Sequence, residues 1–376
     1  MKIVYITNVR IPTPRAQGYA IMKMCEEFSR LGNTVELFIP NRNDADSIGE
    51  PFDYYKIEKI FEIKKVSSTD FLSKTFSFGR FLYWVDIGTF IISLFFRNVA
   101  KKADVIYTRD FIIPLIFSHD DFICLEVHDI PKMKFLFRYI LKKPKMFFVL
   151  NQYIKKSLIE FGVSESKIHI IPSGVDVKMF DSGMKSEEAR QKLSLPQGRE
   201  IVVYTGHFYR WKGVSTLVEV AKNLKEKLFV FVGGVEPELS SLRLECNGLS
   251  NVIIVPHGGR SIVPLYLKAA DVLVVPNSKN SKISSEYTSP LKILEYMASG
   301  KPIVASDLPS IREILNESNS VFATPDDPKS LTESINKVLS DHELASRISK
   351  RARQDVVVYD WNNRAKNIIK FIESKN

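Results

Sequence analysis

The stretch Ile201–Gly213 reads IVVYTGHFYRWKG, and it indicates the fold class. Five residues that favour extended structure lead into a glycine, and the loop that follows carries His207, Arg210 and Lys212. Helix-forming residues begin near Val214. A strand that passes through a glycine loop into a helix is typical of a βα unit. The stretch therefore predicts one unit of a parallel sheet that is covered by helices.

The same alternation of apolar runs and helical patterns extends in both directions along the chain. Further strands of the second half are expected at Leu228–Val232, Val252–Val255, Val272–Val275 and Ile303–Ser306. Strands of the first half are expected at Ile3–Thr7, Val35–Ile39, Val105–Tyr107, Phe122–Glu126, Met146–Leu150 and Ile168–Ile171. The two series meet at Pro172-Ser173-Gly174. We therefore expect an α/β protein with two Rossmann-like, doubly wound parallel-sheet domains, residues 1–172 and 173–358, and a ligand site in the cleft between them.

Composition supports a folded protein without membrane spans. The 376 residues are 45% hydrophobic and 26% charged, which is close to the average for globular proteins. The most apolar stretch, 81–96, is interrupted by Asp86, and the N-terminus lacks the apolar core of a signal peptide. The three cysteines lie far apart, so we expect no disulfide framework, no metal centre and a reducing, cytoplasmic location.

Positive charge is concentrated in one part of the chain. The net charge is +10, and residues 130–159 contain eight basic side chains and no acidic one. They are Lys132, Lys134, Arg138, Lys142, Lys143, Lys145, Lys155 and Lys156. Aromatic side chains are interleaved with them and also fill 71–96, so docking on the anionic inner face of a membrane is one interpretation. A solvated helix face and aromatics that fill a core are the alternatives, and nucleic acid is not the expected partner.

Two segments suit anion binding at helix N-termini. In the first, the loop 12–18 follows the first strand, and Gly18 is expected to open a helix whose free amides could bind an anion or a sugar hydroxyl. A plain turn is the alternative, because the G-x-G-x-x-G pattern of dinucleotide sites is absent.

The second segment, 289–302, reads SPLKILEYMASGKP. Ser289 can cap a helix with proline at its first position, and Gly300 ends it. Glu295 lies less than two turns into this helix, where its carboxylate could accept from the paired hydroxyls of a ribose. The alternative is a solvent-facing glutamate.

Together these segments resemble the retaining glycosyltransferases of the GT-B fold, specifically glycosyltransferase family 4. The resemblance covers nearly the whole chain and is strongest in 206–213, 269–276 and 289–306. The segment 171–176, IPSGVD, is similar to the interdomain PNGVD signature of the family, with Ser173 in place of asparagine. Tyr359-Asp360-Trp361 resembles the start of the family's C-terminal helix, which implies that 359–376 crosses back to the first domain.

The resemblance implies roles for residues of the second domain. Lys212 would bind the donor diphosphate, and His207 stands where the family often has arginine, so Arg210 is expected to supply the second charge. Glu295 matches the second glutamate of the family's E-x7-E motif. The first falls at Tyr287, with Glu286 one residue earlier as the catalytic candidate. The segment also resembles a subgroup with SPLK(L/I)xEYMA, in which the amides after Pro290, that of Leu291 among them, and Lys292 contact the diphosphate.

In the first domain, Glu126-Val127-His128-Asp129 resembles the segment that carries the family's histidine near the point of sugar transfer. A structural role is the alternative for His128. The family implies retaining transfer of a sugar from a UDP or GDP donor to a hydroxyl of a saccharide or lipid-linked acceptor, in cell-surface polysaccharide or glycolipid synthesis and without a metal. A sugar-nucleotide epimerase of similar form and a non-catalytic protein that binds anionic surfaces are the alternative functions.

Overall fold

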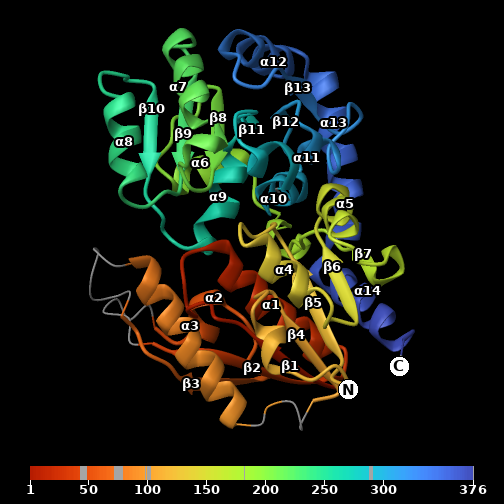
Figure 1. Ribbon diagram of the computed structural model, residues 1–376. Helices are drawn as coiled ribbons and strands as arrows, with labels where there is room; N and C mark the ends of the chain where they lie inside the picture. The colour runs from red at the N-terminus through yellow and green to blue at the C-terminus, as the bar shows by residue number, and fades with distance from the viewer. Residues whose placement is uncertain are drawn as a thin grey trace. The chain divides into compact units, whose positions relative to one another are not determined.

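The computed structural model describes residues 1–42, 49–71, 79–97, 99, 103–181, 183–287 and 291–375. The chain divides into two compact units. Unit 1 consists of Met1–Pro172 and Trp361–Asn376, and unit 2 consists of Ser173–Asp360. Each unit is built around one parallel sheet, and Figure 1 shows the strands and the helices beside them.

The sheet of unit 1 is parallel and has the order β3-β2-β1-β4-β5-β6-β7. Its strands are β1 (Lys2–Ile6), β2 (Thr34–Asn41), β3 (Glu62–Ser67), β4 (Val105–Thr108), β5 (Ile123–Val127), β6 (Met146–Val149) and β7 (Ile168–Ile170). In the central strand β1, Ile3 is paired with Val35 on one side and Val105 on the other. The strand order therefore reverses between β1 and β4, and loops that follow these strands share one edge of the sheet.

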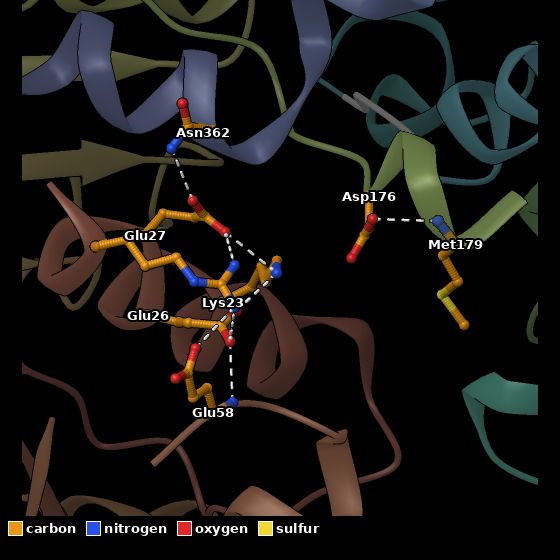
Figure 2. A network of polar contacts seen from close by, with 8 residues as sticks. Lys23, Glu26, Glu27, Glu58, Asp176, Met179 and Asn362 are labelled. Carbon is orange, nitrogen blue, oxygen red and sulfur yellow. Dashed lines mark hydrogen bonds and ion pairs between the residues drawn. The ribbon is translucent and has the colours of Figure 1, made fainter. Parts of the chain in front are cut away.

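The helices of unit 1 include one from the end of the chain. They are α1 (Ala16–Arg30), α2 (Pro51–Tyr55), α3 (Gly79–Phe96), α4 (Lys134–Ile140), α5 (Gln152–Glu160) and α14 (Trp361–Glu373). Helix α14 is amphipathic and packs on α1, where Trp361 contacts the edge of the Tyr19 ring. Figure 2 shows the polar side of this contact, in which the Asn362 amide donates to Glu27 at 3.0 Å. The last helix of the chain is thus part of the first unit.

The sheet of unit 2 is also parallel, with the order β10-β9-β8-β11-β12-β13. Its strands are β8 (Ile201–Thr205), β9 (Leu228–Val232), β10 (Val252–Val255), β11 (Val272–Val275), β12 (Ile303–Ser306) and β13 (Val321–Ala323). Its helices are α6 (Ser186–Lys192), α7 (Val214–Asn223), α8 (Glu238–Glu245), α9 (Val263–Ala269), α10 (Leu291–Ser299), α11 (Pro309–Arg312), α12 (Pro328–Ser340) and α13 (His342–Asp355). The order reverses between β8 and β11, and two doubly wound parallel sheets are confirmed.

Strand β11 shows why this sheet is covered on both faces. Val272 and Val274 belong to one buried apolar cluster, and Leu273 and Val275 belong to another. Successive side chains of a strand point to opposite faces, so a continuous apolar run requires helices on both sides. The uninterrupted Val/Leu composition of β11 therefore determines its central position.

Gly18 and Asp176 lie in two segments that sequence analysis singled out. Helix α1 begins at Ala16, so Gly18 lies in its first turn rather than at its start. A Cβ on Gly18 would collide with the hydroxyl of Tyr55 and the methyl group of Thr13, which explains the glycine. The Asp176 carboxylate accepts from the Met179 amide and caps a short helical turn (Figure 2). Among the helices the structure describes, none has the length and apolar character needed to cross a membrane.

Candidate functional site

The loop after β8 is fixed against the loop after β11, at the point where the strand order reverses. The Ser278 amide donates to the carbonyl oxygen of Trp211 at 3.0 Å. Gly213, with φ +67°, lies at the start of α7, and a Cβ there would collide with the carbonyl oxygen of Pro276. This glycine therefore meets two requirements, a left-handed backbone and a close approach of two loops.

Two lysines from different elements converge above Gly206. The position that a Cβ would take on Gly206 lies 3.7 Å from Nζ of Lys212 and 3.8 Å from Nζ of Lys292. Lys212 ends the short helical turn 210–212, whereas Lys292 lies in the first turn of α10. Nζ of Lys292 lies 3.8 Å from the centroid of the Tyr204 ring, which is a cation–π geometry. Two positive groups therefore face one small space at the carboxyl edge of the sheet.

Among the described residues, neither ammonium group forms an ion pair with a carboxylate. Nζ of Lys292 is buried and has no hydrogen-bond partner there. Burial, followed by the charge of Lys212, holds the pKa of Lys292 well below its ordinary value, although Glu295 acts in the opposite direction. Burial also lowers the pKa of Lys212 to about 8. A buried cation without a counter-ion is costly, so this pair is suited to an anionic ligand such as a diphosphate.

Helix α10 is tied to the end of β8 by one hydrogen bond. The backbone amide of Thr205 donates to Oη of Tyr296 at 2.7 Å, and both groups are buried. Tyr296 follows Lys292 by four residues, so the two side chains lie on the same face of the helix. The bond therefore holds Lys292 at the glycine that follows β8.

Glu295 is buried rather than solvent-facing, and its carboxylate forms an ion pair with Arg260. Arg260 begins the short turn 260–262 that leads into α9, and it follows Gly259, whose φ is +86°. Sequence analysis did not single out Arg260, because 35 residues separate it from Glu295. The Gly258-Gly259 pair before a helix was the available signal of a tight approach.

The loop after β8 also carries a row of nearly parallel rings. The His207 ring lies 5.3 Å from that of Tyr209 and 6.4 Å from that of His257, and Tyr209 lies 6.3 Å from Trp211. Nζ of Lys212 lies over the rings of both Tyr209 and Trp211. Two of these rings, Tyr209 and Trp211, thus lie beside the Lys212 ammonium, whereas Arg210 is exposed.

The other residues predicted for this segment lie in or beside residues whose structure is not described. Ser289 lies outside the described residues, and Leu291 is the first residue of α10 that the structure describes. Glu286 is half-buried in a π-helical turn, 283–287. Its proposed role as a replacement for the missing first glutamate stays a prediction.

In unit 1, the Glu126 carboxylate is the centre of a buried network. It accepts from Oη of Tyr107, from Nε2 of His128 at 2.6 Å and from an Nη atom of Arg364 at 2.9 Å. Nε of Arg109 lies 3.8 Å away. Burial alone would raise the pKa of Glu126, but Arg364, His128 and Arg109 hold it well below its ordinary value. The carboxylate is therefore ionised at neutral pH.

His128 uses both of its ring nitrogens within this network. An Nη atom of Arg109 lies 2.9 Å from Nδ1, and Glu126 is the partner of Nε2. Arginine only donates and an ionised carboxylate only accepts, so the proton of a neutral imidazole is on Nε2. Burial and the charge of Arg109 lower the pKa of His128 to about 4. The ring is thus neutral at physiological pH and is oriented rather than free to take up a proton.

A cavity of about 760 Å³ lies elsewhere on unit 2, beside α13 and the amino ends of β8, β11 and β12. None of the candidate site residues lines it. Across the described ranges, we find no group of three or more His, Cys, Asp or Glu side chains with the geometry of a metal site. Cys25, Cys124 and Cys246 are buried and free.

Comparisons with known proteins identify both units. A model of "Glycosyltransferase Family 4" matches residues 17–179, and a model of "Glycosyl transferases group 1" matches residues 185–355. A Campylobacter jejuni N,N'-diacetylbacillosaminyl-diphospho-undecaprenol alpha-1,3-N-acetylgalactosaminyltransferase is 29% identical over 245 residues, 63% of this chain and 62% of that protein. A D-inositol 3-phosphate glycosyltransferase of Xylanimonas cellulosilytica is 26% identical over 54% of this chain and 51% of its own length. The matched regions therefore cover less than two thirds of the length of each of these relatives.

Solved structures share the fold over the whole chain. Sucrose-phosphate synthase from Thermosynechococcus elongatus has a TM-score of 0.80 at 19% identity and covers 100% of this chain and 98% of its own. Anabaena Alr3699/HepE in complex with UDP-glucose has a TM-score of 0.75 at 16% identity, with 100% of both chains covered. These likenesses agree with a GT-B-like fold built from the two parallel sheets. The two family models together account for most of both units, and the chain belongs to glycosyltransferase family 4, the glycosyl transferases group 1.

Proposed function

We propose that this chain is a retaining glycosyltransferase that transfers a sugar from a UDP-sugar to an acceptor hydroxyl. The observation that carries the proposal is the convergence of the Lys212 and Lys292 ammonium groups above Gly206. The complex of Anabaena HepE with UDP-glucose supports UDP as the nucleotide. GDP stays the alternative, and the experiment below separates the two.

The two lysines would act on the leaving group. As the bond between the anomeric carbon and the β-phosphate oxygen breaks, its electron pair passes to the diphosphate, where two cations stabilise the developing charge. The acceptor hydroxyl then bonds to the same face of the anomeric carbon, and its proton passes to the departing phosphate oxygen. Because the diphosphate accepts this proton, the mechanism needs no separate protein base. That is consistent with a His128 imidazole whose two nitrogens are already engaged.

Glu295 would hold the ribose of the nucleotide. Its carboxylate is paired with Arg260, so a ribose would have to replace this ion pair with its own two hydroxyls. Gly18 is proposed as a donor-binding residue because of its position in the first turn of α1. Glu286 is proposed as a catalytic residue on the basis of the family resemblance.

We propose a lipid-linked or saccharide acceptor, in surface polysaccharide or glycolipid synthesis. The Campylobacter jejuni relative is named for a diphospho-undecaprenol substrate, and the Xylanimonas relative is named for D-inositol 3-phosphate. Both names describe acceptors that carry phosphate.

We further propose a cytoplasmic enzyme that attaches reversibly to anionic membranes through α4. On this helix and the residue before it, Phe135 is 91% exposed, Tyr139 is 55% exposed and Met133 is 46% exposed. Lys134 and Arg138 lie exposed among them. Aromatic side chains flanked by cations suit the interface of an anionic bilayer. Lys143 does not take part, because its Nζ donates to the carbonyl oxygens of Leu115 and Phe117.

Vesicle sedimentation tests the membrane proposal. We expect the protein to pellet with vesicles of phosphatidylglycerol and phosphatidylcholine at low salt and to stay in the supernatant with phosphatidylcholine alone. Phe135→Ser should reduce the pelleted fraction, whereas Leu244→Ser, at an equally apolar and 77% exposed position of unit 2, should not. Equal recovery with both vesicles would leave a protein without membrane affinity.

The donor proposal is tested by thermal shift with UDP, GDP and their sugars. A ligand at 100 times its dissociation constant stabilises a protein by about 2.7 kcal/mol, so a UDP-specific rise in Tm is expected. Lys212→Met and Lys292→Met should abolish the rise, and Lys222→Met, which removes an exposed lysine paired with Glu219, should preserve it. Incubation of the active donor without acceptor then separates transfer from epimerisation, because only an epimerase would form an isomeric sugar nucleotide.

A further inference from the structure

The C-terminal helix brings one charged side chain into the interior of unit 1. Arg364 on α14 is 4% exposed. Its Nε donates to the carbonyl oxygen of Pro172 at 2.8 Å, and an Nη atom lies 2.9 Å from the Glu126 carboxylate. An arginine this buried is retained at a cost unless its partners compensate. Packing alone does not explain it, because the same helix is already held by the hydrogen bond of Asn362 (Figure 2) and by its buried apolar face.

Glu126 connects this arginine to the histidine. The carboxylate lies between Arg364 on one side and His128 on another, and Tyr107 donates to it from the neighbouring strand. Because Arg364 keeps the carboxylate ionised, Glu126 can only accept a hydrogen bond from the imidazole. The proton of His128 is thereby confined to Nε2.

The other ring nitrogen is then directed at Arg109. Nδ1 of His128 accepts from Arg109 at 2.9 Å. Arg109 follows β4, the strand beside the reversal of strand order, and its side chain is 15% exposed. Four side chains, from α14, β5, the loop after β5 and the loop after β4, thus form one chain of charge-assisted hydrogen bonds.

We infer that Arg364 and Glu126 are positioning residues that hold His128 as the neutral Nε2–H tautomer, with Nδ1 turned to Arg109. Neither residue was singled out in the sequence for this role. The consequence for sugar transfer rests on the proposed function, because only there does the orientation of His128 matter for catalysis. The state of the imidazole itself can be measured without a substrate.

The pH dependence follows from the groups that surround the ring. Arg109 and Arg364 disfavour a second proton on His128, and Glu126 favours it. Burial is the largest cause and the arginines add to it, so the pKa of His128 is lowered to about 4. Removing the charge of Arg364 should therefore raise the pH midpoint of the His128 titration, and removing the charge of Glu126 should lower it.

The experiment is a pH titration of ¹⁵N-histidine-labelled full-length protein by two-bond ¹H–¹⁵N correlation spectra. The chain has six histidines, and His128→Asn assigns the signal. Wild-type His128 is expected to show the Nε2–H tautomer down to about pH 5. In Arg364→Met the midpoint should rise by on the order of one pH unit, and in Glu126→Gln the ring should stay neutral to the lowest pH at which the protein is folded.

Three variants separate positioning from mere loss of structure. Arg364→Lys keeps the charge and should restore most of the wild-type titration. Asn362→Ala loosens the same helix at Glu27 and should leave the titration unchanged. If Arg364→Met does not fold, Arg364→Lys and Glu126→Gln still test the inference. An Nδ1–H tautomer in the wild type, or identical titrations in wild type, Arg364→Met and Glu126→Gln, would overturn it whether or not the donor proposal holds.

Discussion

The backbone amide of Thr205 donates to Oη of Tyr296 across 2.7 Å, and this bond joins the last residue of β8 to α10. The next residue after Thr205 is Gly206, above which the Lys212 and Lys292 ammonium groups meet. One tyrosine hydroxyl thus connects the stability of unit 2 to the geometry of its cationic site. The first prediction concerns this hydroxyl.

Tyr296→Phe is expected to lower both stability and nucleotide affinity. The change leaves the buried Thr205 amide without its acceptor, which costs about 1–3 kcal/mol of the free energy of unfolding. Lys292, one turn earlier, loses the contact that fixes its helix, so the Kd for UDP should rise. Urea denaturation and calorimetric titration measure the two effects. Tyr266→Phe is the control, because Tyr266 is a buried residue whose hydroxyl forms no hydrogen bond that is found among the described residues.

Lys292→Met is expected to stabilise the ligand-free protein while it removes UDP binding. Burial and the charge of Lys212 depress the pKa of Lys292, so at neutral pH the unfolded chain binds a proton that the folded chain disfavours. The penalty is fully present below the depressed pKa and is lost as the pH rises toward the ordinary value of lysine. Each kcal/mol regained should raise Tm by roughly 2–4 °C at pH 7.

Measurements of Tm for Lys292→Met and the wild type at several pH values test whether the charge of Lys292 destabilises the folded protein. The difference in Tm should shrink as the pH rises from 7 to 10, because the wild-type lysine is then neutral in the unfolded chain as well. A Tm difference that is independent of pH, or a Lys292→Met protein that is less stable than the wild type, would contradict the prediction.

Binding of UDP should take up protons near pH 8.5. The pKa of Lys212 is about 8, so this lysine is partly neutral at pH 8.5, and the pKa of Lys292 is held well below its ordinary value. A diphosphate between them raises both pKa values, since an opposite charge favours the protonated form. Calorimetric titrations in buffers of low and high ionisation enthalpy measure the uptake, which should be smaller in Lys292→Met. Binding enthalpies that do not change with the buffer would argue against a diphosphate between the lysines.

Apolar runs with turn signals predicted most strands of both sheets, but not two edge strands. Strand β3 reads EIKKVS, and only Val66 in it is fully buried. It is held at the edge by charge, because Glu36 on β2 lies 2.8 Å from Lys64 and also pairs with Lys2. Such a strand has no hydrophobic pattern for a sequence to show. Strand β13 has three residues, too few for any periodicity.

The residues of the candidate site also fall into a group that sequence patterns predicted and a group that they missed. Lys212, Lys292 and Glu295 lie in local motifs with a glycine loop or a helix start, and these patterns point to anion binding without a structure. Arg260 and Arg364 approach their carboxylates from distant parts of the chain. Local sequence does not show which carboxylate each arginine meets, because pairing at long sequence separation is a property of the fold. Sequence patterns therefore found the candidate ligand-binding groups and missed the arginines that pair with Glu295 and Glu126.

The last prediction concerns Gly213, for which unit 2 offers a matched control. Gly213→Ala places a methyl group against the carbonyl oxygen of Pro276 at a φ of +67°, so it combines left-handed strain with a collision of two backbones. Gly248→Ala has a similar φ of +80° but no atom within 4 Å of the new methyl group. The strain alone costs about 1–2 kcal/mol, and it should be the whole effect at Gly248.

At Gly213 the collision must also push the loop after β8 away from β11, so the loss of stability in urea should be clearly larger. The displaced loop carries Lys212, and UDP binding should weaken in Gly213→Ala but not in Gly248→Ala. Equal losses of stability in the two variants, with UDP binding intact in both, would show that the contact between Gly213 and Pro276 does not shape the site.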